Sequence, residues 1–311
     1  MNNQRRTTII QNKPKFSAML QTNAFQKALQ NAMGNPKEIQ KFSAAVTSVV
    51  STNPQLEECE ASTILSAALC GHALALPPSP QLGLYYMVPF KRKAVWENGK
   101  IVQPETKVAT FVLGYRGYIQ LAIRSGQYKR LNVVEIKEGE LINWDPLTEE
   151  ITIKMIEDET ERETAETIGY YAYFRYVNGF EKALYWSKDK MKQHALEYSA
   201  GYASDVNKGT SYTFWAKDFD AMAKKTMLRQ LISKWGVMSV EMQNAYIADG
   251  AVLDKDGNPE SYSDDNMIEA EFDTSQLNNE ELKQQQIDDD PYVATQFTDE
   301  PQSFSIDDLA E

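Results

Sequence analysis

The sequence predicts an α+β fold, in which an antiparallel β-sheet made of hairpins packs with helices that come before and after it. Apolar residues recur at helical spacing through the first eighty residues. Segments rich in β-branched and aromatic residues follow, and two of them flank Asn178-Gly179, a pair that favours a tight hairpin turn. Helical spacing returns at residue 188. Because the strands are grouped between two helical regions instead of alternating with helices, antiparallel pairing is expected.

The N-terminal helices begin and end at characteristic residues. Residues 15–33 are expected to form one helix that ends at Gly34, since glycine readily adopts the left-handed C-cap conformation. Pro36 suits the first turn of the next helix, which should stop before Asn53. A third helix is expected over residues 60–76.

The middle of the chain has the composition of strands and turns. The run Glu97-Asn98-Gly99-Lys100 predicts a hairpin turn, and residues 115–124 form a short helix that ends at Ser125-Gly126. The acidic run over residues 157–166 is expected to be a solvated loop. The remaining expected elements are strands over residues 83–90, 106–113, 131–136, 151–156, 168–177 and 180–186, and helices over residues 188–198 and 211–235.

Charge is divided unevenly along the chain. From Leu253 to Glu311 there are 18 acidic and 2 basic residues, a formal charge of −16, whereas the preceding 252 residues carry 30 basic and 26 acidic side chains, a charge of +4. Between residues 86 and 130, nine Lys or Arg residues stand against two acidic ones, among several aromatics. This pattern favours a surface that binds a nucleic acid. A solvated charged face is the alternative interpretation for any single residue.

Composition divides the chain into three parts. We expect an N-terminal helical extension over residues 1–34, a core over residues 35–250, and an acidic, mostly disordered tail over residues 251–311. No apolar stretch is long enough to span a bilayer, and the N-terminus lacks the apolar run of a signal peptide. Cys59 and Cys70 are the two cysteines, so no disulfide framework is expected and the cytoplasm is the expected compartment.

Several kinds of enzyme chemistry lack the residues that they need. A phosphate-binding loop requires glycines before Lys-Thr, but Lys225-Thr226 lies within a predicted helix with no glycine nearby. We therefore expect no nucleotide hydrolysis, no requirement for ATP and no cofactor. His72 and His194 are the two histidines, which leaves little material for a histidine-based metal site or catalytic triad.

A metal-dependent DNA nuclease is one alternative. Glu135-Ile136-Lys137 supplies the Glu and Lys spacing with which some nucleases hold a metal ion and a water molecule. No acidic residue lies on the preceding strand, and a Glu and a Lys two positions apart on a strand are common on protein surfaces.

Two predicted helices carry the stronger candidates for phosphate contact. In residues 115–124, Arg116 and Arg124 share one face and have no acidic neighbour there. In residues 211–235, Lys217 and Lys224 can pair with Asp220, which is the structural explanation for Lys217 and partly for Lys224. Lys225 and Arg229 of the same helix are better candidates because Arg229 has no carboxylate four positions away. The nearby aromatics Phe214, Trp215 and Phe219 fit a core better than a stacking surface.

Four segments together resemble the RecT family of phage and prophage single-strand annealing recombinases, over about residues 35–240. The segments are Asn53-Pro54-Gln55-Leu56, Gly83-Leu84-Tyr85-Tyr86-Met87-Val88-Pro89, Gly114-Tyr115-Arg116-Gly117 through Arg124-Ser125-Gly126, and Lys217-Asp218-Phe219-Asp220-Ala221-Met222-Ala223-Lys224-Lys225-Thr226. The resemblance implies a curved antiparallel sheet backed by a helix, and a core that binds single-stranded DNA and anneals it to its complement without ATP in homologous recombination and double-strand-break repair. It also implies that the chain is not a hydrolytic enzyme.

The same resemblance implies partners. They are single-stranded and annealed duplex DNA, further copies of the chain in a ring or helical filament, a phage exonuclease and a host single-stranded-DNA-binding protein. The chain would act in the bacterial cytoplasm and be encoded by a phage or prophage. A phage structural or interaction protein, whose basic surface binds another protein's acidic segment, is the second alternative.

Annealing requires a grip on phosphates that leaves base edges free, so basic residues on the first hairpin and on the helices around a groove are the expected DNA contacts. No catalytic and no metal-binding residue is expected. The expected DNA-binding residues are Lys91, Arg92, Lys93, Lys107, Tyr115, Arg116, Arg124, Lys129, Arg130, Lys224, Lys225 and Arg229.

Overall fold

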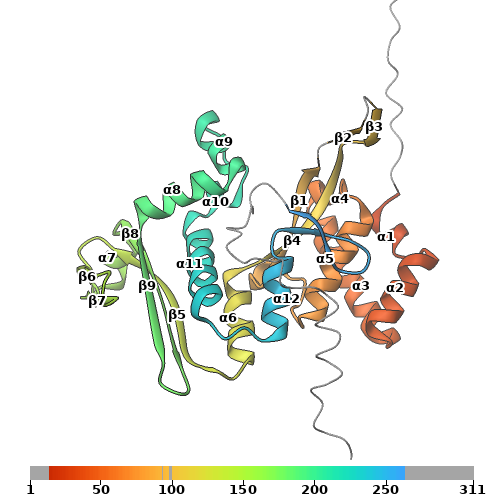
Figure 1. Ribbon diagram of the computed structural model, residues 1–311. Helices are drawn as coiled ribbons and strands as arrows, with labels where there is room; N and C mark the ends of the chain where they lie inside the picture. The colour runs from red at the N-terminus through yellow and green to blue at the C-terminus, as the bar shows by residue number, and fades with distance from the viewer. Residues whose placement is uncertain (1–13, 93, 98–99, 263–311) are drawn as a thin grey trace, which may run out of the picture. The chain divides into compact units, whose positions relative to one another are not determined.

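The computed structural model describes residues 14–92, 94–97 and 100–262. All of them fall within one compact unit, residues 1–268. The predicted class is confirmed, because helices before and after a set of antiparallel strands account for most of these residues (Figure 1). The tail expected from residue 251 lies outside the described residues from residue 263 onward.

Five helices begin the described chain: α1 (Phe16–Met19), α2 (Asn23–Met33), α3 (Pro36–Ser51), α4 (Pro54–Glu57) and α5 (Ala61–Ala73). The single helix expected over residues 15–33 is interrupted, because Thr22 is extended and its hydroxyl donates to the carbonyl oxygen of Met19, 2.7 Å away. Gly34 is the left-handed C-cap of α2, as predicted. Asn53 caps α4 by accepting hydrogen bonds from the backbone of Gln55 and Leu56, which gives the first family-like segment a structural role.

The first sheet joins distant parts of the chain. A 3-10 turn (η1, Pro80–Leu82) leads into β1 (Tyr85–Arg92), which pairs along its whole length with β4 (Thr106–Leu113). Between β1 and β4, β2 (Val95–Glu97) pairs with β3 (Lys100–Gln103), and the central residues of the turn predicted there, Asn98 and Gly99, lie outside the described residues. On the other side of β4 lie β10 (Ala251–Leu253) and β11 (Pro259–Tyr262). The expected core boundary at residue 250 therefore falls inside this sheet.

The second sheet has the order β5-β8-β9. Its strands are β5 (Tyr128–Lys137), β8 (Thr167–Tyr176) and β9 (Glu181–Ser187), and β8 and β9 form the hairpin predicted around Asn178-Gly179. A separate hairpin of β6 (Leu141–Asp145) and β7 (Glu150–Ile153) follows β5. The acidic run expected to be a loop instead contains α7 (Glu159–Thr164), from which Arg162 binds the buried carboxylate of Glu140 at 2.6 Å.

Six further helices connect and cover the sheets: α6 (Tyr115–Arg124), α8 (Lys188–Tyr198), α9 (Ala200–Lys208), α10 (Phe214–Lys217), α11 (Phe219–Trp235) and α12 (Val240–Ala248). The helix expected over residues 211–235 is divided because Asp218 leaves the helical conformation and caps α11. Helices α9 and α12 were not predicted.

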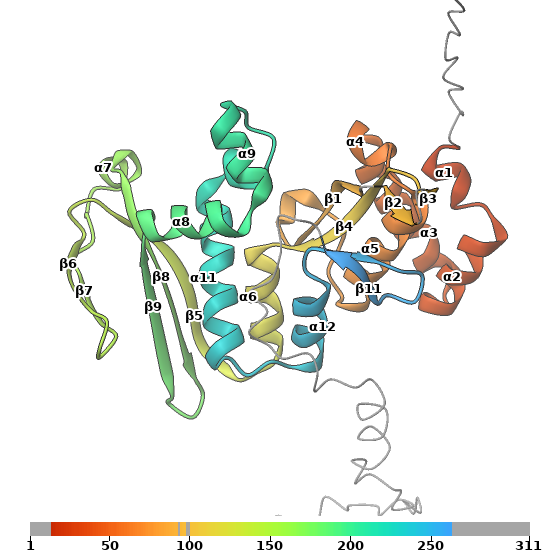
Figure 2. The same ribbon diagram turned by 45° about the horizontal axis from the view of Figure 1, so that its top comes forward.

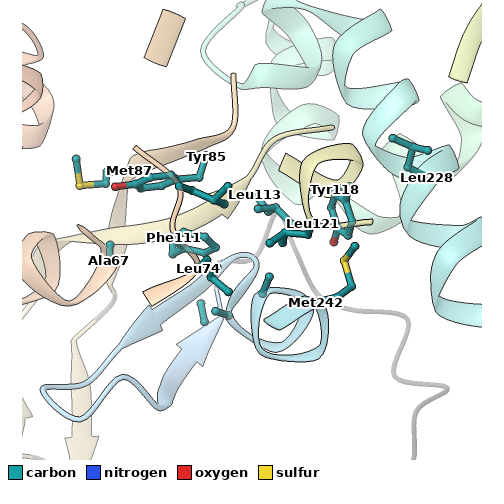
Figure 3. Packing of buried hydrophobic residues seen from close by; sticks show 14 of the residues in the cluster. Ala67, Leu74, Tyr85, Met87, Phe111, Leu113, Tyr118, Leu121, Leu228 and Met242 are labelled. Atoms are coloured by element: carbon teal, nitrogen blue, oxygen red, sulfur yellow. The ribbon is translucent and has the colours of Figure 1, made fainter. Parts of the chain in front are cut away.

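One apolar core runs between these elements. Tyr118 and Leu121 of α6 lie between Leu113 of β4 and Met242 of α12, with Leu228 of α11 beyond (Figure 3). All of these side chains are at most 2% exposed, and α6 packs against both α11 and α12, while α12 also contacts β4 and β10 of the first sheet directly. No helix among the described residues is both long and apolar enough to cross a membrane.

Candidate nucleic-acid interface

The three remaining family-like segments meet where α6 begins. A methyl group on Gly114 would lie 2.1 Å from the carbonyl oxygen of Gly83, and one on Gly117 would lie 2.2 Å from that of Leu84. Only glycine permits such close approach of two backbones. The entry to β1 is thereby fixed against the first turn of α6, and the side chains of both segments project from one place.

Five side chains with aromatic rings or positive charge gather there: Tyr86, Tyr115, Arg116, Phe214 and Lys224, called here the Tyr115 cluster. The ammonium group of Lys224 lies 5.4 Å from the centre of the Tyr115 ring, and Nε of Arg116 donates to the Tyr115 hydroxyl at 3.2 Å. The rings of Tyr86 and Phe214 are 5.6 Å apart. Strand β1, helix α6 and the α10–α11 region thus share one mixed aromatic and basic surface.

Lys224 also forms an ion pair with a residue of β5. Its ammonium group donates to Glu135 Oε1 at 2.8 Å, and Lys137 lies 3.1 Å from the other carboxylate oxygen. Partial burial opposes ionisation of Glu135, but the two ammonium groups outweigh it and lower its pKa. The carboxylate of the Glu135–Lys137 pair is therefore bound by two lysines, and no set of three His, Cys, Asp or Glu side chains within the described residues converges as metal ligands would. The nuclease alternative gains no support from this geometry.

Two exposed aromatics extend the surface. Tyr212, in the turn between α9 and α10, is 76% exposed, and Phe214, the first residue of α10, is 41% exposed. The turn is ordered by Asp205, whose carboxylate accepts hydrogen bonds from the hydroxyls of Thr210 and Thr213 and from the backbone of Tyr212 and Thr213, at 2.6 to 2.9 Å. These bonds, led by the one from Thr210, lower the pKa of Asp205 to about 2. A rigid turn that presents exposed rings suits base stacking.

Lys225 and Arg229 lie in the interior, not on this surface. Lys225 donates to Asp249 Oδ1 at 2.8 Å and Arg229 to Asp249 Oδ2 at 2.7 Å, and Asp249 is fully buried. The prediction that their charges have no carboxylate partner is wrong. Lys225 and Arg229 lie on α11, whereas their partner Asp249 lies at the C-terminal end of α12. Asp220, expected to pair with Lys217 and Lys224, accepts instead from the hydroxyl of Tyr170 at 2.5 Å. Lys217 is exposed and forms no ion pair with any described residue.

The cations of the first hairpin are paired with carboxylates. Lys91 lies 2.8 Å from Glu105, and Lys107 binds Glu58. The Arg92 guanidinium, with its side chain 15% exposed, lies between Glu60 and Glu260 at 3.3 and 3.2 Å, and so ties β1 to α5 and β11. Lys93 lies outside the described residues. Surface pairs such as that of Lys91 are weak and exchange readily for a phosphate, whereas Arg92 is held inside the fold.

The other predicted contacts separate into two groups. Arg124 donates to the carbonyl oxygens of Leu74 and Ala75 at 2.7 and 2.9 Å, so its guanidinium caps the end of α5. Lys129 and Arg130 are exposed at the start of β5 and form no ion pair with another described residue. Tyr115, Arg116 and Lys224 are the predicted residues that the structure brings together.

Sequence reasoning missed Tyr86, Tyr212 and the exposed position of Phe214. An aromatic residue in a polar turn, as in Thr210-Ser211-Tyr212-Thr213, is the signal that would have identified Tyr212, because its ring has no helical or strand face to be buried against. Tyr86 gives no such signal, since it alternates with the buried Tyr85 and Met87 like any strand residue.

Comparison with known proteins gives consistent matches. The RecT family model matches residues 40–267. An uncharacterized protein, YqaK of Bacillus subtilis (strain 168), is 39% identical over 221 residues, which cover 71% of this chain and 67% of that protein. Protein RecT of Escherichia coli (strain K12) is 31% identical over 196 residues, covering 63% of this chain and 65% of that protein. The matched region thus spans about two thirds of either relative.

Proposed function

Since the chain belongs to the RecT family, we propose that it binds single-stranded DNA and anneals complementary strands without ATP, in homologous recombination and in double-strand-break repair of the phage type. The observation that carries the proposal is the Tyr115 cluster, where three separate family-like segments place two cations and two rings on one surface, beside a third ring from Phe214. Phosphates and bases are the ligand groups that such a surface suits.

The Tyr115 cluster, with the neighbouring exposed residues Tyr212 and Lys217, offers contacts to DNA without a means of reading its sequence. Arg116 and the exposed Lys217 supply charge for phosphates, and Tyr212 and Phe214 supply flat surfaces for any base. Lys224 is partly neutralised by Glu135, and its pKa is raised by that carboxylate against the opposing effect of burial, so it stays charged. Specificity would then come from base pairing, which is favourable by about 1.4 kcal/mol per stacked step in duplex DNA. Neutralising phosphates lowers the repulsion between two strands and so lowers the kinetic barrier to pairing.

The proposal includes an assembly and a place of action. The chain would work as a homo-oligomer, a ring or helical filament, on single-stranded and annealed duplex DNA in the bacterial cytoplasm. A phage exonuclease would supply the single strands, and a host single-stranded-DNA-binding protein would be a further partner. Family membership is what supports these statements.

The test is an annealing assay with two complementary oligonucleotides, without ATP, combined with a binding titration at several salt concentrations. Arg116→Gln should weaken binding of all sequences equally and reduce the slope of log affinity against log salt by about 0.7, the value for one lost phosphate contact on a single strand. Lys37→Gln, an exposed change on α3, is the control and should leave the slope unchanged. An unchanged slope in Arg116→Gln would remove this residue from the interface, and absence of annealing by the unaltered chain would refute the function.

A further inference from the structure

The β5-β8-β9 sheet has a second face that the Tyr115 cluster does not use. On β8, Tyr170, Ala172 and Phe174 are fully buried on the side where α11 packs (Figure 2). Tyr171 and Tyr173 alternate with them and point to the other side, where they are half-buried. This other side is called the outer face.

Strand register shows which neighbours share the outer face. On β5, Arg130 is opposite Arg175 and Asn132 is opposite Tyr173. On β9, Ala183 is opposite Tyr173 and Tyr185 is opposite Tyr171. The β6–β7 hairpin contacts β9 through a ring contact of 5.7 Å between Trp144 and Tyr185 and through an ion pair of 2.8 Å between Glu149 and Lys182.

The aromatic rings of the outer face are held in position. The rings of Tyr171 and Tyr173 are nearly parallel, at 13°, with centres 6.4 Å apart. The Tyr173 hydroxyl donates to Glu181 at 2.7 Å. A methyl group on Gly169 would lie 2.4 Å from the Tyr185 hydroxyl, so the Tyr185 side chain lies across the strand at a position that only glycine leaves open. Ordered, half-exposed rings lose little conformational entropy when a flat ligand stacks on them.

Positive charge borders these rings. Lys129 and Arg130 are exposed, and the side chain of Arg175 is 44% exposed. The one carboxylate among these neighbours, that of Glu181, is 3.7 Å from Arg175 and is also bound by Tyr173. Three cations against one carboxylate, next to parallel rings, complement the phosphates and bases of a polynucleotide.

We infer that the outer face is a second binding surface for single-stranded DNA, on which bases stack on Tyr171 and Tyr173 while Arg130, Arg175 and Lys129 contact phosphates. The inference rests on the proposed function, because an annealing protein must handle two strands. Glu135 and Lys224 lie on the α11 side of β5, since Glu135 is opposite the buried Tyr170. The sheet therefore separates the two surfaces, and one chain can hold a second strand while the first remains bound.

The experiment counts the oligonucleotides bound per chain. The unaltered full chain is titrated with a labelled single-stranded oligonucleotide of noncomplementary sequence, and the same titration is made with Arg130→Gln and with Arg130→Gln/Tyr173→Leu. The unaltered chain should show a tighter and a weaker site. Arg130→Gln should weaken the weaker site by about 5-fold at 0.1 M salt, as expected for one lost phosphate contact, and leave the tighter site within 2-fold. Lys192→Gln, an exposed change on α8, is the matched control.

Photocrosslinking with an iodouracil-containing oligonucleotide locates the weaker site independently of any variant, and should mark Tyr171 or Tyr173. Loss of the double variant to misfolding would leave Arg130→Gln and the crosslink as tests. A single site in the unaltered chain, or crosslinks absent from the outer face, would overturn the inference. So would a change in the oligomeric state of DNA-free Arg130→Gln with unaltered DNA stoichiometry, which would make this face a contact between copies. Failure of the proposed function has a different result, because the unaltered chain would then bind neither the labelled oligonucleotide nor the iodouracil-containing one.

Discussion

The ammonium nitrogen of Lys225 lies 2.8 Å from Oδ1 of Asp249, and both side chains are buried. Asp249 also accepts from Arg229, from the hydroxyl of Tyr118 at 3.1 Å and from the backbone of Leu113 at 2.9 Å. Burial opposes ionisation of this carboxylate, but the two cations outweigh it and lower its pKa. One side chain thus joins α11, α6 and β4 at the centre of the fold.

Asp249→Asn should destabilise the chain by about 3–5 kcal/mol, because it leaves two buried cations without their counter-charge. Urea unfolding followed by circular dichroism measures the loss. Asp256→Asn, an exposed change in the turn between β10 and β11, is the control and should change the unfolding free energy by less than about 0.5 kcal/mol. Equal stability of the two variants would show that the buried pair contributes nothing.

Lys225→Ala and Arg229→Ala should impair annealing far more than Lys217→Ala does, but through unfolding. At a temperature where each variant is still folded, binding of single-stranded DNA by Lys225→Ala should keep the salt slope of the unaltered chain. Lys217→Ala should keep its stability and lose about 0.7 from the slope. A reduced slope in folded Lys225→Ala would place that lysine in contact with phosphate.

Tyr212→Ala should weaken binding of single-stranded DNA by about 1–3 kcal/mol, the usual cost of one lost base stack, without lowering stability. The ring is 76% exposed, so its removal leaves no cavity. Tyr262→Ala, at another partly exposed tyrosine, serves as the comparison in the same anisotropy titration. Equal affinity of Tyr212→Ala and the unaltered chain would show that the Tyr212 ring does not contact DNA.

Asp205 gives a pH dependence with a definite sign. Its pKa falls from an ordinary 3.8 to about 2 in the folded chain, so its carboxylate stabilises the fold above pH 3.8 and this contribution is lost as the pH falls toward 2. The stability difference between the unaltered chain and Asp205→Asn should therefore shrink between pH 4 and pH 2 in urea unfolding. A difference that stays constant over that range would contradict the assignment.

Removal of residues 269–311 should leave a folded chain that binds single-stranded DNA at least as tightly as the full chain. This segment contributes 13 acidic residues and one lysine, so its loss changes the formal charge from −12 to 0. The affinity difference should shrink as salt screens the charge. A chain ending at Gly250 should instead be destabilised, because it lacks the fully buried Ala251 and Val252. Loss of DNA binding in the chain that lacks only residues 269–311 would show that this acidic segment belongs to the binding surface.

Local signals predicted the local elements well. Helix α8 (Lys188–Tyr198) has the predicted bounds, since Ser187 caps its start, and Asn178-Gly179 forms the predicted hairpin turn. Strand β10 was not predicted, because three residues are too few to show a period and its partner Phe111 is 140 positions away in the chain. Likewise, Arg116 and Lys224 could be identified as candidates from their helices, but the pairing of Lys225 with Asp249 could not, because helix-neighbour rules extend only four positions.

The pairing of β10 with β4 also has a consequence for folding during synthesis of the chain. Strand β4 is complete at Leu113. Its second neighbour, β10, and the Asp249 carboxylate that binds the Leu113 backbone are synthesised only with residues 249–253. During synthesis, at roughly 5–20 residues per second, the β1–β4 hairpin must therefore wait for at least several seconds with one edge open. Closure of so long a loop is a slow step in folding. In the interval that open edge is available to other strands, and a chaperone would have its greatest use there.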